Sequence, residues 1–128
     1  MTDVLPISVR LHKHSQKLEL CYRNTSLFSL SCEYLRVHSP SAEVQGHGEG
    51  QEILQTGKIN IAITAVEPVG NYGLKLVFDD GHDSGIYTWE YLRALCDNQE
   101  VWWKNYLERL EKAGASRDPD VSPVRLLG

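Results

Sequence analysis

Apolar and polar residues alternate along two short segments near the N-terminus. Apolar side chains occupy every second position from 7 to 11 and again from 18 to 22, and the polar residues 13–16 separate the two runs. Because successive side chains of a β-strand point to opposite faces of a sheet, this period of two predicts half-buried strands. The short polar joint between them predicts an antiparallel hairpin.

A helical spacing follows this hairpin. Leu30, Tyr34 and Val37 recur at the spacing of one helix face. Ser29 precedes them and is placed to cap the helix, and Pro40 ends it because proline interrupts helical hydrogen bonding. Residues 39–57 then contain four glycines and weak periodicity, so we predict a long loop that is either functional or mobile.

A second alternating pair fills the middle of the chain. Apolar residues alternate over 59–65, in a strand that ends at Pro68, and again over 72–78. These runs predict two further strands joined by a turn. The phase of the second run places Leu76 at the interface between the sheet and the helices, where we expect it to be buried.

The last third of the chain changes from strand to helix signals. Residues 79–82 have the composition of a tight turn, and residues 86–87 predict a short returning strand. Thr88 is placed to cap a helix, and residues 97–100 resemble a capping box that starts a second helix. Gly114 suits the end of that second helix. The apolar residues of the first helix are Trp89, Leu92 and Leu95.

These elements together predict an α+β fold, in which a small antiparallel or mixed sheet built from hairpins packs against C-terminal helices. We expect one domain over residues 1–115 and a disordered tail over 116–128, because the tail has no apolar pattern. Trp102 and Trp103 are neighbours on the second helix and lie about 100° apart around its axis. Either one of them is exposed as a partner contact, or the apolar face of the helix is broad.

Composition excludes several classes of protein. The chain has 128 residues, 41% hydrophobic and 23% charged, which is typical of one globular domain. A net charge of -4 gives no basic face for nucleic acid. Without a membrane-length apolar run or a signal peptide, we expect no membrane partner and a cytoplasmic location. Cys21, Cys32 and Cys96 form no CxxC pair, so we expect free thiols.

Histidines and carboxylates offer candidate sites that also have plainer interpretations. The His12-Lys13-His14 segment is either a metal pair or a solvated turn. His47-Gly48-Glu49 matches half of an iron-binding triad, but the chain is too short for an oxygenase barrel. Residues 46–50 have spaced glycines that suit a phosphate, although plain flexibility is the preferred interpretation. Residues 79–83 are rich in Asp and suit a divalent ion, although turn chemistry is preferred there.

No motif of an activated nucleophile or a phosphate-binding Walker loop occurs in the sequence. The pattern of residues therefore does not require an enzyme.

Three stretches together resemble one known family. They are Tyr34–Val44 (YLRVHSPSAEV), Val66–Tyr72 (VEPVGNY) and Asp79–Arg93 (DDGHDSGIYTWEYLR). They resemble the γ-butyrobetaine-hydroxylase-like N-terminal domain, formerly described as a domain of unknown function, over roughly residues 5 to 95. The third stretch is the most specific of the three.

The resemblance implies a zinc site and also its loss. In the carnitine-pathway hydroxylases this domain precedes an iron- and 2-oxoglutarate-dependent oxygenase domain, and three cysteines and one histidine hold a structural zinc. The resemblance places the histidine at His82 and the cysteines at Ser39, Ser41 and Val44. Serine is a poor zinc ligand and valine is none, so we expect no bound cofactor. Residues 96–128 are too few for the oxygenase domain, so hydroxylase activity is not implied.

We therefore expect a stand-alone, non-catalytic binding or adaptor module whose partner is a protein. Related domains are fused to scaffold proteins of iron–sulfur cluster assembly, so the resemblance implies a link to iron–sulfur or metal handling. The alternative is a metal-binding protein associated with an iron- and 2-oxoglutarate-dependent oxygenase activity. Its ligands would be His82, the neighbouring aspartates and either His38 or His47.

The expected binding surface joins the loop after the first helix to the turn around His82. Because a single zinc joins these segments in the relatives, we expect residues 39–44 to contact the turn through hydrogen bonds from Ser39 or Ser41. The residues of this surface are Arg36, His38, Ser39, Ser41, Glu43, His47, Asp80 and His82.

Overall fold

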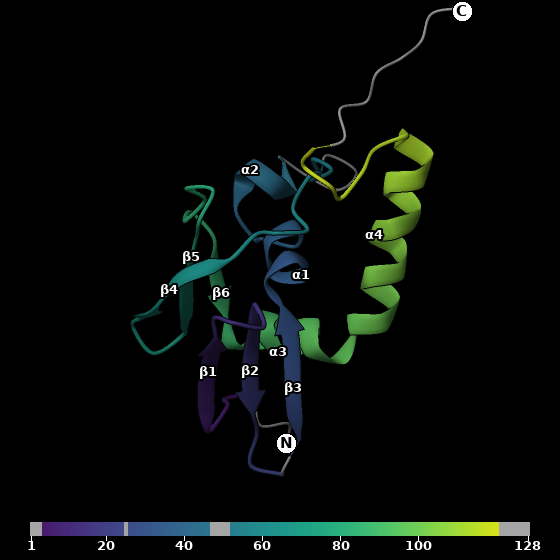
Figure 1. Ribbon diagram of the computed structural model, residues 1–128. Coiled ribbons are helices and arrows are strands. Elements are labelled where there is room, and N and C mark those ends of the chain that lie inside the picture. The colour runs from purple at the N-terminus through teal and green to yellow at the C-terminus, as the bar shows by residue number, and fades with distance from the viewer. Residues whose placement is uncertain (1–3, 25, 47–51, 121–128) are drawn as a thin grey trace, which may run out of the picture.

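Two three-stranded antiparallel sheets and four helices make up the computed structural model, which describes residues 4–24, 26–46 and 52–120 (Figure 1). This is the predicted α+β class. The strands dominate the first two thirds of the chain, and the two longer helices follow them.

The first sheet has the order β1-β2-β3, with β1 at Ser8–His12, β2 at Lys17–Cys21 and β3 at Leu27–Ser31. The hairpin of β1 and β2 confirms the alternation in the sequence. Strand β3 corrects the helix predicted from Ser29. Leu30 pairs with Leu18 across the sheet, and both are fully buried, so strand pairing decides the conformation of this segment rather than its helical spacing.

Helix α1 (Cys32–Val37) therefore starts later than predicted. Its N-cap is Ser31, whose Oγ accepts a hydrogen bond from the backbone N–H of Tyr34 at 3.0 Å. A serine stands at both 29 and 31, so the composition around the boundary suited either start. The short helix α2 (Ala42–Gln45) follows, with Ser41 as its N-cap.

The second sheet has the order β4-β5-β6, with β4 at Ile63–Val69, β5 at Gly73–Phe78 and β6 at Ile86–Thr88. Strand β4 starts four positions later than the run at 59 predicted and includes Pro68. Proline is tolerated there because β4 is an edge strand. A register shift lies between Ile63 and Ala65.

Helix α3 (Trp89–Asp97) begins as predicted, because Thr88 Oγ1 accepts a hydrogen bond from the Tyr91 N–H at 3.1 Å. Helix α4 (Gln99–Ala113) does not use the predicted capping box. Asn98 makes no side-chain cap to α4; its amide instead donates to the Ala94 carbonyl at 2.8 Å and closes α3. Gly114 ends α4 with a φ of +63°, as predicted.

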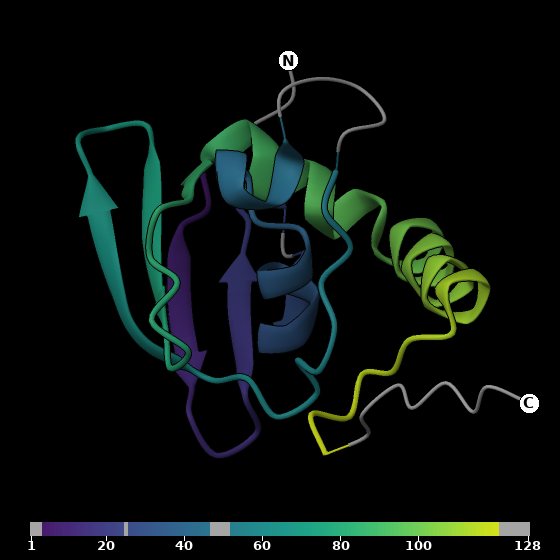
Figure 2. The same cartoon turned by 90° about the horizontal axis from the view of Figure 1, so that it is seen from above.

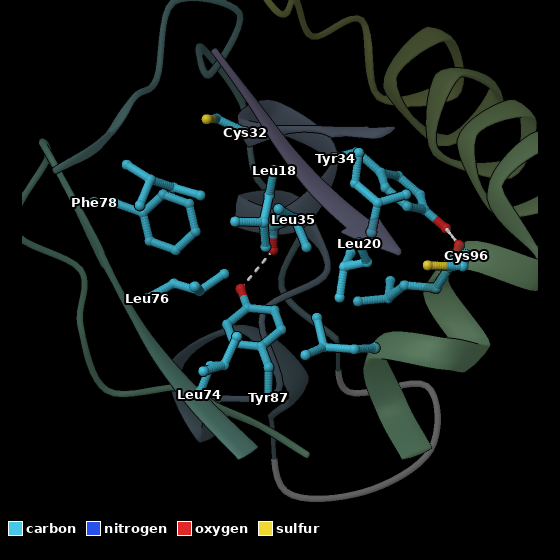
Figure 3. Close-up of a cluster of buried hydrophobic side chains, with 14 of the residues drawn as sticks. Leu18, Leu20, Cys32, Tyr34, Leu35, Leu74, Leu76, Phe78, Tyr87 and Cys96 are labelled. Atoms are coloured by element: carbon cyan, nitrogen blue, oxygen red, sulfur yellow. Dashed lines mark hydrogen bonds between the residues drawn. The ribbon is translucent and has the colours of Figure 1, made fainter. Parts of the chain in front are cut away.

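The core lies between the two sheets and the helices α1 and α3 (Figure 3). Leu76 is fully buried in it, as the strand phase predicted. Two tyrosine hydroxyls reach across the core to backbone carbonyls: Tyr87 donates to Leu35 at 2.6 Å, and Tyr34 donates to Leu95 at 2.7 Å. These bonds tie α1 to β6 and to α3.

Both tryptophans of α4 are half-buried, so the interpretation of a broad apolar face fits better than that of one exposed indole. Trp103 packs edge-on to Tyr34, and Trp102 stacks on His38. None of the helices in the described part of the chain is long and apolar enough to cross a membrane.

The C-terminal segment differs from the expectation of disorder at its start. The Gly57 N–H donates to the Ser116 carbonyl at 2.9 Å, and the Ile59 N–H donates to the Arg117 carbonyl at 3.0 Å. Figure 2 shows this segment turning back after α4 to lie beside the chain that precedes β4. The predicted start of the tail at Ser116 is therefore too early, and residues 121–128 lie outside the described residues.

Candidate functional site

Ser39, His82 and Glu43 form a hydrogen-bonded array that we call the clasp. Ser39 Oγ lies 2.8 Å from His82 Nε2, and His82 Nδ1 lies 3.3 Å from Glu43 Oε2. Since a carboxylate only accepts, we assign the ring proton to Nδ1, which faces Glu43, and with this tautomer the Ser39 hydroxyl donates to Nε2. Ser39 is fully buried and His82 is 7% exposed.

A second serine contact supports the clasp. Ser41 Oγ lies 2.7 Å from Ser84 Oγ, and the Ser41 N–H donates to Ser39 Oγ at 3.2 Å. The expected contact between residues 39–44 and the His82 turn is therefore present. Gly85 allows it, because a Cβ at Gly85 would lie 2.5 Å from Ser39 Oγ. Only a residue without a side chain lets the two segments approach this closely.

An ion-pair network joins Asp80, in the turn that carries His82, to Arg36 and Lys58. Asp80 Oδ2 accepts from Arg36 Nε at 3.0 Å and from Lys58 Nζ at 2.7 Å, and Asp80 Oδ1 accepts from the His82 N–H at 3.1 Å. Arg36 also donates to Gln55 Oε1 at 3.0 Å. Burial alone raises the pKa of an aspartate, but the hydrogen bonds from Lys58, the His82 backbone and Arg36 lower the pKa of Asp80 to about 2.

The surroundings of His82 favour the neutral form of its imidazole. Burial lowers the pKa of His82, and the Arg36 guanidinium lowers it further. The carboxylates of Glu43 and Asp80 oppose this shift without reversing it. The neutral ring is the form that accepts the Ser39 hydroxyl proton at Nε2.

The clasp has the order of groups of a serine–histidine–carboxylate triad, but it is closed to substrate. A catalytic serine must reach the reacting atom, whereas Ser39 has no exposed surface and its Oγ lies against Gly85. Its hydroxyl is engaged by His82 and by the Ser41 N–H. The array therefore joins two loops and does not expose a nucleophile.

The residues at the family's zinc positions do not fit zinc. Val44 offers no donor, and the serines are poor ligands whose hydroxyls already bond to His82 and Ser84. His82 Nε2 is hydrogen-bonded to Ser39, and His82 Nδ1 faces the Glu43 carboxylate. Across the described residues, no group of three or more His, Cys, Asp or Glu side chains is arranged to hold a metal ion. Hydrogen bonds therefore join the residues at these positions.

The other sequence candidates lie apart from the clasp. His38 is stacked on Trp102, its Nδ1 lies 2.9 Å from the Tyr34 carbonyl, and burial lowers its pKa. His47 lies outside the described residues. His12 pairs with Glu19 at 3.3 Å on the first sheet. At the acidic turn, Asp79 Oδ1 accepts the Ala62 N–H at 3.2 Å.

Several functional residues were missed by the sequence reasoning. Lys58 and Gln55 complete the network around Arg36, and Ser84 completes the contact of Ser41. Lys58 and Gln55 stand in or beside the glycine-rich loop, and no motif marks them. Ser84 lies within the stretch that carries the family resemblance, so this signal was available.

Comparisons with known proteins agree on one family. The model of the family described as gamma-butyrobetaine hydroxylase-like, N-terminal, matches residues 9–93. Two NMR solution structures are 52% and 48% identical, with TM-scores of 0.80 and 0.76, covering 96% and 100% of this chain and 97% and 99% of their own.

A crystal structure of a protein of unknown function from Acidithiobacillus ferrooxidans, of the DUF971 family, is 36% identical with a TM-score of 0.62. It covers 73% of this chain and 97% of its own. A comparison with curated proteins gave no match.

Proposed function

Because this chain belongs to the gamma-butyrobetaine hydroxylase-like N-terminal domain family, we propose that it is a non-catalytic module that binds a partner protein at the loops joined by the clasp. The observation that supports this proposal is the sealed clasp itself. Ser39 and His82 are buried and bonded to each other, so the serine exposes no nucleophile, and their contacts fix two surface loops in one arrangement. Loops held by a rigid scaffold are where binding residues concentrate.

The proposed contact surface is the exposed rim of these loops. The side chain of Glu43 is 70% exposed, and the exposed Asp83 directly follows His82. Two apolar residues lie beside them: Ile53, 55% exposed, whose N–H donates to the Val44 carbonyl, and Ile86, 42% exposed, which directly follows Gly85.

Exposed carboxylates beside exposed isoleucines suit a partner that presents basic residues around an apolar centre. The acidic rim disfavours nucleic acid for the same reason that it favours a basic protein surface. We infer that any link to iron–sulfur or metal handling resides in the partner, since the donor set at the clasp does not fit a metal.

Charge reversal on the rim tests the proposal. Asp83→Lys should abolish saturable binding of the partner in cross-linking from host extract, with a photo-reactive amino acid placed at Ile86. Glu108→Lys on α4 is the matched control, because Glu108 is equally acidic and exposed but lies on another element; this variant should bind like the wild type.

Equal capture by the wild type and both variants would refute the proposed surface. Absence of any saturable cross-link to a protein would refute the binding role itself.

A further inference from the structure

A buried carboxylate on α1 is paired with an arginine from the C-terminal segment. Glu33 is 5% exposed. The Arg117 guanidinium donates two hydrogen bonds to its carboxylate, from Nη2 to Oε1 at 2.6 Å and from Nε to Oε2 at 2.8 Å. The guanidinium also lies 5.1 Å from the centroid of the Trp103 ring. A carboxylate combined with an aromatic face recognises a guanidinium through charge-assisted hydrogen bonds and a cation–π contact.

The backbone of the same segment is bound as an extended peptide would be. The carbonyls of Ser116 and Arg117 accept from the N–H groups of Gly57 and Ile59. Pro119 lies over Gly57, where a Cβ would be 3.3 Å from the proline Cα. Residues 116–119 thus lie along the chain before β4 (Figure 2), and we call the site that they occupy, beside Gly57, Ile59, Glu33 and Trp103, the groove.

The groove opens into a cavity of about 460 Å³. Arg117 is the only cationic residue among those that line this cavity in the described chain, whereas both Glu33 and Glu100 line it. Removing Arg117 would leave two carboxylates and the Trp103 face, with the buried Glu33 uncompensated. The cavity would then select strongly for a cation.

The two partners of this ion pair differ in exposure. The side chain of Arg117 is 36% exposed, whereas that of Glu33 is 6% exposed, so the acceptor belongs to the body of the domain and the donor lies at the surface. A tethered segment competes with an external one only through its effective concentration, which is in the millimolar range for short links.

We propose that this groove is a binding site for an arginine side chain carried by an extended segment of a partner protein, and that residues 116–119 fill it when that partner is absent. The site is separate from the clasp, so a test that refutes this proposal leaves the proposed function above unaffected. The recognised unit is an arginine that enters between Glu33 and Trp103, with its backbone carbonyls on Gly57 and Ile59.

The test uses the full-length Arg117→Ala variant and a capped peptide of residues 115–120, Ala-Ser-Arg-Asp-Pro-Asp. Calorimetry and the NMR shift of the Trp103 indole N–H report binding. We expect the variant to bind the peptide about tenfold or more tightly than the wild type does, since the tethered segment no longer carries the arginine that binds Glu33 and so competes less strongly. The peptide should also raise the melting temperature of the variant.

Matched controls give the result its specificity. A peptide with alanine in place of arginine should not bind, and the variant Arg117→Ala with Glu33→Gln should lose binding. Arg109→Ala, which removes an exposed arginine of α4, should behave like the wild type.

The proposal is overturned if the folded Arg117→Ala protein does not bind the arginine peptide. It is also overturned if this protein binds the alanine peptide as tightly as the arginine peptide. If Arg117→Ala does not fold, the same peptide experiment is done with Arg117→Lys, because lysine keeps the positive charge and cannot make the bidentate hydrogen bonds to Glu33. The Lys variant should then take up the arginine peptide with the same shift of the Trp103 signal.

Discussion

Replacing Ser39 by alanine tests whether the clasp stabilises the fold. The change removes one hydroxyl and leaves two buried groups without their partner, the Nε2 lone pair of His82 and the backbone N–H of Ser41. Each unsatisfied buried polar group costs about 1–3 kcal/mol. Water has little room to replace the hydroxyl, because Ser39 is fully buried against Gly85 and Pro40. We expect a loss of about 2–4 kcal/mol in the free energy of unfolding.

Urea denaturation followed by far-UV circular dichroism measures this loss. With an m-value of about 2 kcal/mol per molar, a loss of 3 kcal/mol lowers the midpoint by about 1.5 M. Ser29→Ala is the control, since Ser29 is an exposed strand residue and its replacement should change stability by less than about 0.5 kcal/mol. Amide exchange should accelerate in residues 39–44 and remain unchanged in α4.

A loss below about 1 kcal/mol for Ser39→Ala would refute the reasoning, because it would mean that the two groups find other partners at little cost. So would an equal acceleration of exchange in α4, which would show that the clasp is not a local device.

Leu76→Ala should cost about 2–5 kcal/mol in chemical denaturation, because Leu76 is fully buried between the sheet and the helices; a loss under about 1 kcal/mol would show that the core closes over the cavity. Since burial lowers the pKa of His82 in the fold, its contribution is fully present above the unfolded pKa of about 6.5 and is lost as the pH falls toward the folded value. Urea midpoints should therefore fall more steeply below about pH 6.5 in the wild type than in His82→Gln, and parallel profiles would contradict this. A chelator should leave the melting temperature unchanged, because hydrogen bonds join Ser39, Ser41 and His82, the positions at which the resemblance implies zinc ligands. A drop of several degrees together with stoichiometric zinc in the untreated protein would contradict this prediction.

Alternation in the sequence predicted the hairpins and the burial of Leu76, because one buried face imposes a period of two on a strand. It failed at β3, where the spacing of Leu30 and Tyr34 suits a helix while the pairing with β2 requires a strand. That pairing is a tertiary contact, and local pattern carries no information about it. The predicted cap of α4 was wrong for a similar reason, since the Asn98 amide bonds to the end of the preceding helix and does not cap the next one.

The site was predictable in part. The contact between Ser39 and His82 followed from the family resemblance and not from any local pattern, since 43 positions separate the two residues. The pair of Glu33 and Arg117 spans 84 positions and lies partly beyond the stretch that resembles the family. Neither residue stands in a motif, so only the folded chain shows that one compensates the other.

The position of Pro68 has a consequence for behaviour at high concentration. Strand β4 is seven residues long and forms an edge of its sheet, and an edge of that length is a template onto which a strand from another molecule can add. Proline offers no N–H to an incoming strand, and the register shift between Ile63 and Ala65 bends the other end of the edge away from a flat line. The two irregularities together shorten the straight stretch of edge with which a strand of another molecule could pair, and they therefore oppose extension of the sheet into an aggregate.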